Sequence, residues 1–181
     1  MHRLTCNKNC TYYFCSVINV CHLQNDSSKK KFRHEKSNAG NRLSTYVYVI
    51  IYFCYRSIGL EYELRLEREL RLMNITFSDE NVLRSRGYDK TPDFKLDVPI
   101  AIDGFIVNWV ESKALFGDEE NHSGYLKEQL LCYWNRFGPG LVIYWFGYLE
   151  TLESTPEVNS MFILRTNFPD KTSITQYKMD I

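Results

Sequence analysis

The later two thirds of the chain have almost no cysteine. Five of the six cysteines lie at or before residue 54, and only Cys132 follows them. A disulfide framework is therefore excluded for residues 55–181. The chain also lacks a long apolar run, because the longest, residues 46–55, is about half of what spans a bilayer. With no apolar signal after Met1, we expect a protein of a reducing, intracellular compartment that does not enter membranes.

Basic charge is concentrated near the N-terminus. Residues 1–58 contain nine Lys and Arg against two Asp and Glu (+7), whereas residues 59–181 contain thirteen against twenty (−7). The polar stretch 22–45, with its basic run 29–36, is typical of a flexible linker, and a nuclear-import signal or a phosphate-contacting arm are the alternatives. The early cysteines match no common zinc spacing. We therefore expect a basic, partly flexible segment over residues 1–53 and one folded domain over residues 54–181.

Periodicity and turn signals predict alternating helices and strands after residue 58. In chain order these are helices over 59–73 and 78–87, strands over 94–102 and 105–110, a helix over 125–137, and strands over 141–148 and 161–165. Asp103-Gly104 fits a type I′ turn, which makes the first two strands a hairpin. The alternation over residues 60–66 also permits a strand, but Leu, Glu and Arg favour the helix. This order predicts an α/β fold with helices packed on a sheet.

Two acidic residues and a lysine stand at the ends of the predicted hairpin strands. Asp93 follows Pro92 at the start of the first strand, and Glu111 and Lys113 point to the same face of the second. Hydrolysis of a phosphodiester needs a hard cation, and Mg²⁺ prefers carboxylate oxygens. We therefore predict that Asp93 and Glu111 are ligands of Mg²⁺, or of Mn²⁺, with the Ser112 carbonyl as a third oxygen.

Lys113 would then orient or deprotonate the attacking water, or stabilise the charge that grows on the phosphorus oxygens. A surface salt bridge between Glu111 and Lys113, which would contribute little energy, is the alternative interpretation.

The predicted helix over residues 59–73 carries a carboxylate on its apolar side. At about 100° per residue, Glu63 falls within about 20° of Leu70, in the middle of the apolar arc. A carboxylate there costs free energy unless it is paired or binds a metal. Glu63 is therefore predicted as an additional metal ligand or as a carboxylate that orients one. Glu67, about 40° away on the same helix, competes for this role.

Two polar side chains on the helix predicted over residues 125–137 face the same way. Gln129 and Tyr133 are four residues apart, which would bring an amide and a phenol near Lys113 or the scissile phosphate. Tyr133 alone is also typical of a hydrophobic core. The aromatic residues Trp134, Phe146 and Tyr148 could form a partner surface, but we expect them in the core.

Together these residues resemble the PD-(D/E)XK nuclease superfamily. The matching elements are a helix glutamate (Glu63), Pro92-Asp93, Glu111-x-Lys113 and a helix with Gln129-x3-Tyr133. Longer stretches, residues 86–94, 111–119 and 133–145, are similar to the codanin-interacting nuclease family. The resemblance runs from about residue 55 to residue 168, so residues 1–53 lie outside it.

The resemblance implies a restriction-endonuclease-like core, a mixed sheet flanked by helices, within residues 54–181. It also implies a metal-dependent nuclease that binds codanin, occurs in nucleus and cytoplasm, and is linked in vertebrates to erythroid differentiation. Asp93, Glu111 and Lys113 would be catalytic, with Gln129 and Tyr133 in support. Nothing in the sequence chooses between DNA and RNA. The rival hypothesis is a nuclease fold with weak catalysis that serves mainly to bind codanin, and such a scaffold would survive the loss of Lys113.

Overall fold

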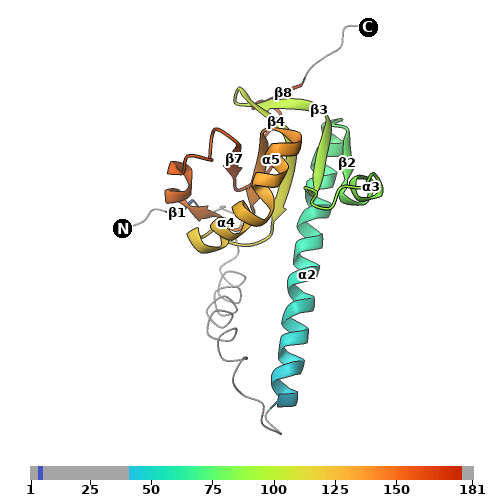
Figure 1. Cartoon of the computed structure of the whole chain (residues 1–181), viewed down its shortest axis with the longest axis vertical. Coiled ribbons are helices and arrows are strands. Elements are labelled where there is room, and N and C mark those ends of the chain that lie inside the picture. The colour runs from blue at the N-terminus through green and yellow to red at the C-terminus, as the bar shows by residue number, and fades with distance from the viewer. Residues whose placement is uncertain (1–3, 6–40, 177–181) are drawn as a thin grey trace. The chain divides into compact units, whose positions relative to one another are not determined.

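A mixed six-stranded sheet is the centre of the computed structural model, which describes residues 4–5 and 41–176 (Figure 1). The strand order is β2-β3-β4-β5-β7. Off this path, β8 pairs with residues 100–102 of β3, whereas β2 pairs with residues 94–96. Pairing is antiparallel from β2 to β4 and parallel from β4 to β7. The strands of this sheet are β2 (Phe77–Asp79), β3 (Phe94–Ile102), β4 (Phe105–Lys113), β5 (Gly140–Tyr144), β7 (Phe162–Arg165) and β8 (Ile174–Gln176).

Helical segments account for most of the remaining described chain. They are α2 (Asn41–Leu72), α3 (Glu80–Ser85), α4 (Glu119–Tyr125), the π-helical turn η1 (Leu126–Leu130), α5 (Leu131–Phe137) and the 3₁₀ turn η2 (Glu150–Ser154). A separate two-stranded sheet joins β1 (Leu4–Thr5) to β6 (Tyr148–Leu149). The expected α/β fold, a mixed sheet flanked by helices, is confirmed. Its arrangement is consistent with a restriction-endonuclease-like core.

The chain divides into two compact units, residues 8–60 and residues 61–181 with 1–7. The predicted domain boundary at residue 53 stays a prediction. The predictions for the early cysteines and for the basic run 29–36 fall on residues 6–40, outside the described residues. In the part of the chain that the structure describes, no helix is both long enough and apolar enough for a membrane span.

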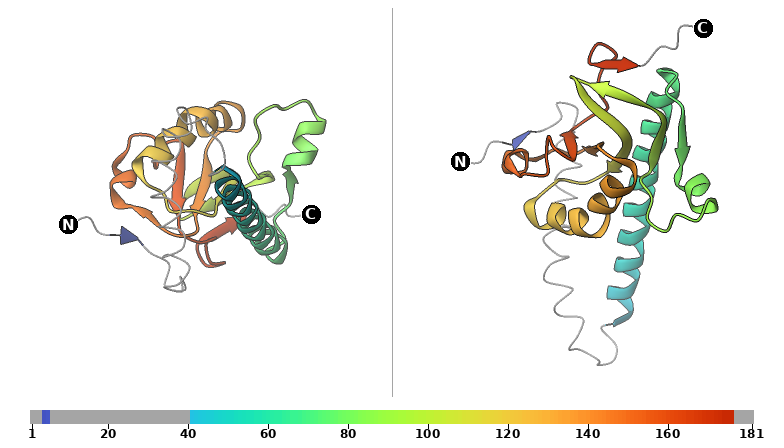
Figure 2. Two further views of the ribbon diagram at one scale, coloured as in Figure 1. Left: turned by 90° about the horizontal axis from the view of Figure 1, so that it is seen from below. Right: turned by 45° about the horizontal axis from the view of Figure 1, so that its top comes forward.

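Helices cover both faces of the sheet (Figure 2). On one face, α5 packs on Trp109 of β4 through an aromatic pair whose centroids are 5.4 Å apart. Because alternate residues of a strand point to opposite faces, Glu111 and Lys113 share the face of Trp109. Ser112 faces the other way and accepts a hydrogen bond from the indole of Trp145. The part of α2 after residue 60 packs on that indole, with ring centroids 5.1 Å apart.

The hairpin that carries the predicted site forms as expected. Asp103 and Gly104 both have positive φ, 49° and 85°, as a type I′ turn requires. β4 runs to Lys113, three residues beyond the predicted end, so the whole of Glu111-Ser112-Lys113 is paired with β5. The strand pairing therefore holds the acidic and basic groups on a rigid element.

α2 begins earlier than the sequence predicted. We expected linker up to residue 45 and a helix from Gly59, but α2 starts at Asn41 and continues through Gly59 to Leu72. Residues 46–58 contain no proline, so each backbone N–H can join the helix. One interior glycine costs about 1 kcal/mol relative to alanine, which is too little to end a long helix. The alternative of a strand over residues 60–66 is wrong.

Two further boundaries differ from prediction. Ser78 lies in β2, and α3 starts after Asp79, whose carboxylate accepts from Val82 N at 2.8 Å and caps the helix. This early strand escaped prediction because it is only three residues long. β5 ends at Tyr144 rather than at residue 148, because the chain turns at Gly147, where φ is 95°.

Of the three aromatic residues expected in the core, two are there. Phe146 and Tyr148 are buried, whereas Trp134 is 36% exposed. The prediction for Trp134 is wrong because successive residues of a helix lie about 100° apart, so that burial of Tyr133 turns its neighbour outward.

Candidate active site

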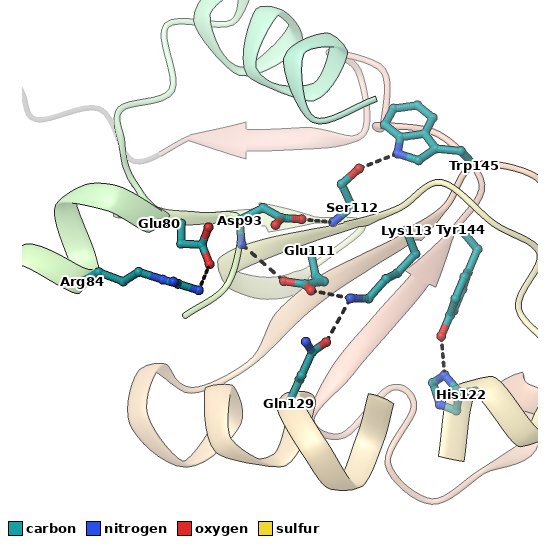
Figure 3. A network of polar contacts seen from close by, with 10 residues as sticks. All are labelled: Glu80, Arg84, Asp93, Glu111, Ser112, Lys113, His122, Gln129, Tyr144 and Trp145. Atoms are coloured by element: carbon teal, nitrogen blue, oxygen red, sulfur yellow. Dashed lines mark hydrogen bonds and ion pairs between the residues drawn. The ribbon is translucent and has the colours of Figure 1, made fainter. Parts of the chain in front are cut away.

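The two carboxylates and the lysine that were singled out in the sequence lie together at the end of the hairpin (Figure 3). Lys113 Nζ donates to Glu111 Oε1 at 2.6 Å, and only 12% of the lysine and 4% of the glutamate side chain is exposed. Asp93 joins them just before β3, where its backbone N–H donates to Glu111 Oε2 at 3.3 Å. The alternative of a surface salt bridge is wrong, because both partners are almost withdrawn from water.

Ser112 connects Asp93 to the other face of the sheet. Its backbone N–H donates to Asp93 Oδ2 at 2.7 Å, and its Oγ accepts from Trp145 Nε1 at 2.8 Å. The backbone thus fixes one oxygen of Asp93, while Asp93 Oδ1 makes no hydrogen bond to another described residue. One carboxylate oxygen is therefore available for a ligand.

The two carboxylates are held together at an electrostatic cost. Burial raises the pKa of Asp93 well above its usual range, and the negative charge of Glu111 raises it further. The Ser112 N–H and the Lys113 ammonium lower this pKa but do not offset the two larger effects. A site that crowds negative charge in this way favours a cation.

Gln129 meets the lysine from the helical layer. Lys113 Nζ donates to Gln129 Oε1 at 2.9 Å in addition to its bond with Glu111. Burial lowers the pKa of Lys113, but the charge and hydrogen bond of Glu111 outweigh burial, and the net pKa is raised. The lysine is therefore held as an ammonium ion. Gln129 lies in the π turn η1, and such turns inside α-helices are frequent at functional sites.

Glu63 adds a third negative charge from α2. It is partly buried, and its charge is among those that raise the pKa of Asp93, so it lies within electrostatic reach of the carboxylates. Its competitor Glu67 instead accepts from Arg71 on the surface, at 2.6 Å. The structure therefore favours Glu63 over Glu67 as the helix carboxylate of the site.

Residues 25–167 match the model of a family described as "Protein of unknown function TPD sequence-motif". Thr91-Pro92-Asp93 is the only Thr-Pro-Asp sequence in the chain, and it contains the acidic residue that faces Glu111. The chain belongs to this family.

Relatives of this TPD-motif protein carry a more specific name. It is 55% identical over 117 residues to "CDAN1-interacting nuclease 1" of Danio rerio (65% of this chain, 38% of the relative) and 51% identical over 114 residues to that of Xenopus tropicalis (63% and 37%). The Homo sapiens protein is 51% identical over 113 residues (62% and 40%). The predicted resemblance to codanin-interacting nucleases is thereby confirmed, and the chain spans about two fifths of these relatives' length. No solved structure matches it.

The two carboxylates of this site, Asp93 and Glu111, suit a hard divalent cation such as Mg²⁺. No group of three or more His, Cys, Asp and Glu side chains within the described residues could hold a metal. Mg²⁺ needs only one or two carboxylates, because it keeps several of its waters. Asp93 and Glu111 meet this requirement, and a divalent cation would relieve their mutual repulsion. A four-ligand structural zinc site does not fit.

Tyr133 is a core residue close to the two carboxylates. Its ring packs on Trp109 in the hydrophobic cluster. Burial, followed by the charges of Glu111 and Asp93, raises the pKa of its phenol, which therefore stays neutral near the carboxylates. No hydrogen bond joins it to Lys113 among the described contacts, so the predicted supporting role of Tyr133 stays a prediction.

Two basic residues tie the loop before β3 to the helical layer. Lys90 Nζ donates to the carbonyl of Glu128 at 2.6 Å. Arg136 donates to the carbonyl of Lys90 at 3.1 Å and pairs with Asp89 at 2.7 Å. This loop leads directly to Asp93, and Glu128 precedes Gln129. The contacts of Lys90 and Arg136 therefore connect the loop that leads to Asp93 with the helical segment that contains Gln129. We call these contacts the loop latch.

Sequence reasoning missed other polar residues beside the site. Tyr125 lies against Lys113, with Nζ 4.4 Å from the ring centroid. The buried His122 shares a hydrogen bond of 2.9 Å with the hydroxyl of Tyr144, and burial lowers the pKa of this histidine. Residues 119–124 precede the helix predicted from residue 125, yet they form most of α4, where Asp118 caps the helix by accepting from Asn121 N. That Asp-Glu-Glu-Asn start was the available signal, since such caps favour a helix.

Proposed function

We propose that this chain contains the active site of a Mg²⁺-dependent nuclease that hydrolyses phosphodiester bonds of nucleic acid. The observation that carries the proposal is the buried arrangement of Asp93 and Glu111 with the ammonium of Lys113. Burying two carboxylates and a lysine costs free energy that an apolar core would not incur. The name of the relatives, which includes the word nuclease, supports this reading.

Asp93 and Glu111 would hold the metal ion, with the Ser112 carbonyl as an additional oxygen and Glu63 as a nearby carboxylate that orients these ligands. When bound there, the ion would neutralise charge on the phosphate oxygens and activate a water. Asp93 is oriented for this role by the Ser112 N–H, which occupies only one of its oxygens.

Lys113 would act on the reacting groups as a donor. An ammonium has three N–H groups, and two of them are used by Glu111 and Gln129. The third is left for the attacking water or a phosphate oxygen. Because the pKa of Lys113 is raised, we favour orientation of the water and stabilisation of negative charge over removal of a proton.

Nucleic acid is the class of substrate that we propose. Charge in residues 59–181 is net acidic, so the basic groups near the site would supply the contacts with phosphates. Arg86 is exposed in the loop before β3 and has no hydrogen bond or ion pair through its side chain to another described residue. It is therefore the clearest candidate for such a contact.

The test is cleavage of labelled single-stranded, duplex and branched DNA and RNA by the whole chain, with Mg²⁺ or Mn²⁺. Asp93→Ala and Lys113→Ala should each lose at least about a hundredfold in rate. Lys171→Ala, which removes an exposed lysine before β8, beyond the hairpin turn and away from Asp93 and Glu111, is the matched control and should cleave as the wild type does. Absence of cleavage by folded, metal-binding wild type would contradict the proposal.

We also propose that the chain binds codanin and that it acts in nucleus and cytoplasm. In vertebrates, this action would belong to erythroid differentiation. The relatives' printed name, CDAN1-interacting, supports the partner. Binding of purified codanin, measured for wild type and Lys113→Ala, separates this from catalysis. A pure interaction module would bind codanin and would show no metal-dependent cleavage with any substrate.

A further inference from the structure

An aromatic ring outside the recognised motif faces the lysine of the site. Lys113 Nζ lies 4.4 Å from the centroid of the Tyr125 ring, close enough for a cation–π interaction. Tyr125 is the last residue of α4, directly before η1. It is partly buried and packs against the hydrophobic cluster next to the site.

The ring adds a third contact to the two hydrogen bonds of the ammonium. Glu111 Oε1 lies 2.6 Å and Gln129 Oε1 2.9 Å from Lys113 Nζ, and the centroid of the Tyr125 ring lies 4.4 Å from the same nitrogen. A lysine side chain has four rotatable bonds, so contacts from several directions are needed to hold its end in one place. These three contacts therefore restrict the orientation of the ammonium.

The helical layer is built so that two side chains reach the lysine at once. Tyr125 and Gln129 are four residues apart and one turn from each other on the helix. Tyr125 directly precedes the π turn over residues 126–130, and Gln129 lies within this turn, so the angular offset between the two side chains differs from that in an α-helix. Both side chains contact the same nitrogen.

The ring, rather than the hydroxyl, makes the contact. The Tyr125 hydroxyl has no hydrogen bond to another described residue, whereas its ring face meets Lys113. Core packing alone would not require an aromatic side chain, because a leucine could fill a similar partly buried position. A cation over the ring, in contrast, requires the aromatic face.

We propose that Tyr125 is a positioning residue, whose ring holds the Lys113 ammonium between Glu111 and Gln129 with one N–H left for the reacting group. The proposal rests on the proposed function of Lys113. It concerns the orientation of the lysine and not the binding of metal, because Asp93 and Glu111 carry that role. Tyr125 acts through Lys113 and need not touch the substrate.

The first arm of the test compares Tyr125→Phe with Tyr125→Leu in the whole chain. Phenylalanine keeps the aromatic face, so its kcat should stay within about twofold of the wild type. Leucine removes the face, and kcat should fall about tenfold, with KM and the Kd for Mg²⁺ unchanged. Equal activity of the leucine variant, or an equal loss in both variants, would overturn the proposal.

The second arm does not depend on activity. In protein labelled with ¹³C-lysine, the Hε resonance of Lys113, assigned with Lys113→Arg, should be displaced upfield by the ring current. The displacement should persist in Tyr125→Phe and vanish in Tyr125→Leu, while the exposed Lys127 stays unchanged. A wild-type chain that cleaves nothing would overturn the proposed function, and this resonance would still decide the ring contact. An undisplaced Lys113 signal would overturn the contact itself.

Discussion

Two carboxylate–cation pairs in this molecule have similar chemistry and opposite surroundings (Figure 3). Glu80 and Arg84 are one turn apart on α3, with 46% and 60% of their side chains exposed. Glu111 and Lys113 lie on one strand, with 4% and 12% exposed. Water competes for the first pair and screens it, so it contributes little to stability. The second pair is costly to bury, which indicates a purpose other than stability.

The largest expected effect comes from breaking each pair at its carboxylate. Glu111→Ala leaves Lys113 buried without its main partner and should lower the free energy of unfolding by about 3 kcal/mol. Glu80→Ala should lower it by less than about 0.5 kcal/mol. Urea denaturation at pH 7 without metal measures both. Equal losses in the two variants would mean that burial does not distinguish the pairs.

A second prediction concerns the carboxylate beside the buried pair. Asp93→Asn removes a negative charge yet keeps an acceptor for the Ser112 N–H, so metal-free protein at pH 7 should gain roughly 1–2 kcal/mol of stability. Affinity for Mg²⁺, measured by calorimetry, should fall. The exposed Asp103, paired with Arg165, is the control, and Asp103→Asn should change neither property.

The pH dependence of this gain follows from the raised pKa of Asp93. The folded chain binds the proton of Asp93 more tightly than the unfolded chain does. The contribution of this proton to the free energy of unfolding is therefore fully present below the unfolded pKa. It is lost as the pH rises through the folded pKa. The advantage of Asp93→Asn over metal-free wild type should therefore grow between acidic and neutral pH. An advantage that is constant with pH would contradict the assigned cause.

A third prediction tests the loop latch, whose charges are exposed but join two elements. Arg136→Ala should slow cleavage about tenfold by letting Asp93 shift relative to Gln129. Arg84→Ala, which breaks a pair within one helix, should leave the rate unchanged. Arg136→Lys should recover part of the rate. An unaltered rate in Arg136→Ala would show that the latch does not position the site.

The smallest expected effect comes from a buried base. Burial lowers the folded pKa of His122, so the unfolded chain binds its proton more readily. Stability should therefore fall as the pH decreases below about 6.5, the usual histidine value. In His122→Phe the fall between pH 7 and pH 5.5 should be shallower, as thermal denaturation can measure. An equal slope in both proteins would assign the pH dependence to other groups.

The hairpin and its charged residues could be predicted because their signals are local. Asp103-Gly104 sets the turn, and the two-residue period of a strand puts Glu111 and Lys113 on one face. The contact between Tyr125 and Lys113 could not be predicted in this way. Whether Tyr125 meets Lys113 depends on how the helical layer lies on the sheet and on a π turn, which no short pattern in the sequence indicates.

The length of α2 was missed for a different reason. Gly59 and the aromatic, β-branched residues before it have weaker helix propensity than the Leu, Glu and Arg that follow. Propensity is a weak guide, however, and residues 46–58 contain no residue that prevents a helix. The exposure of Trp134 likewise depends on helix orientation, which hydrophobicity alone does not give.

The most direct test measures metal binding and cleavage on the same samples of wild type, Lys113→Ala and Asp93→Asn. If the buried pair and Asp93 form a phosphodiesterase site, Lys113→Ala keeps its affinity for Mg²⁺ and loses cleavage by at least about a hundredfold. Asp93→Asn loses both. Cleavage by Lys113→Ala at the wild-type rate would contradict the account, because the buried ammonium would then have no part in the reaction.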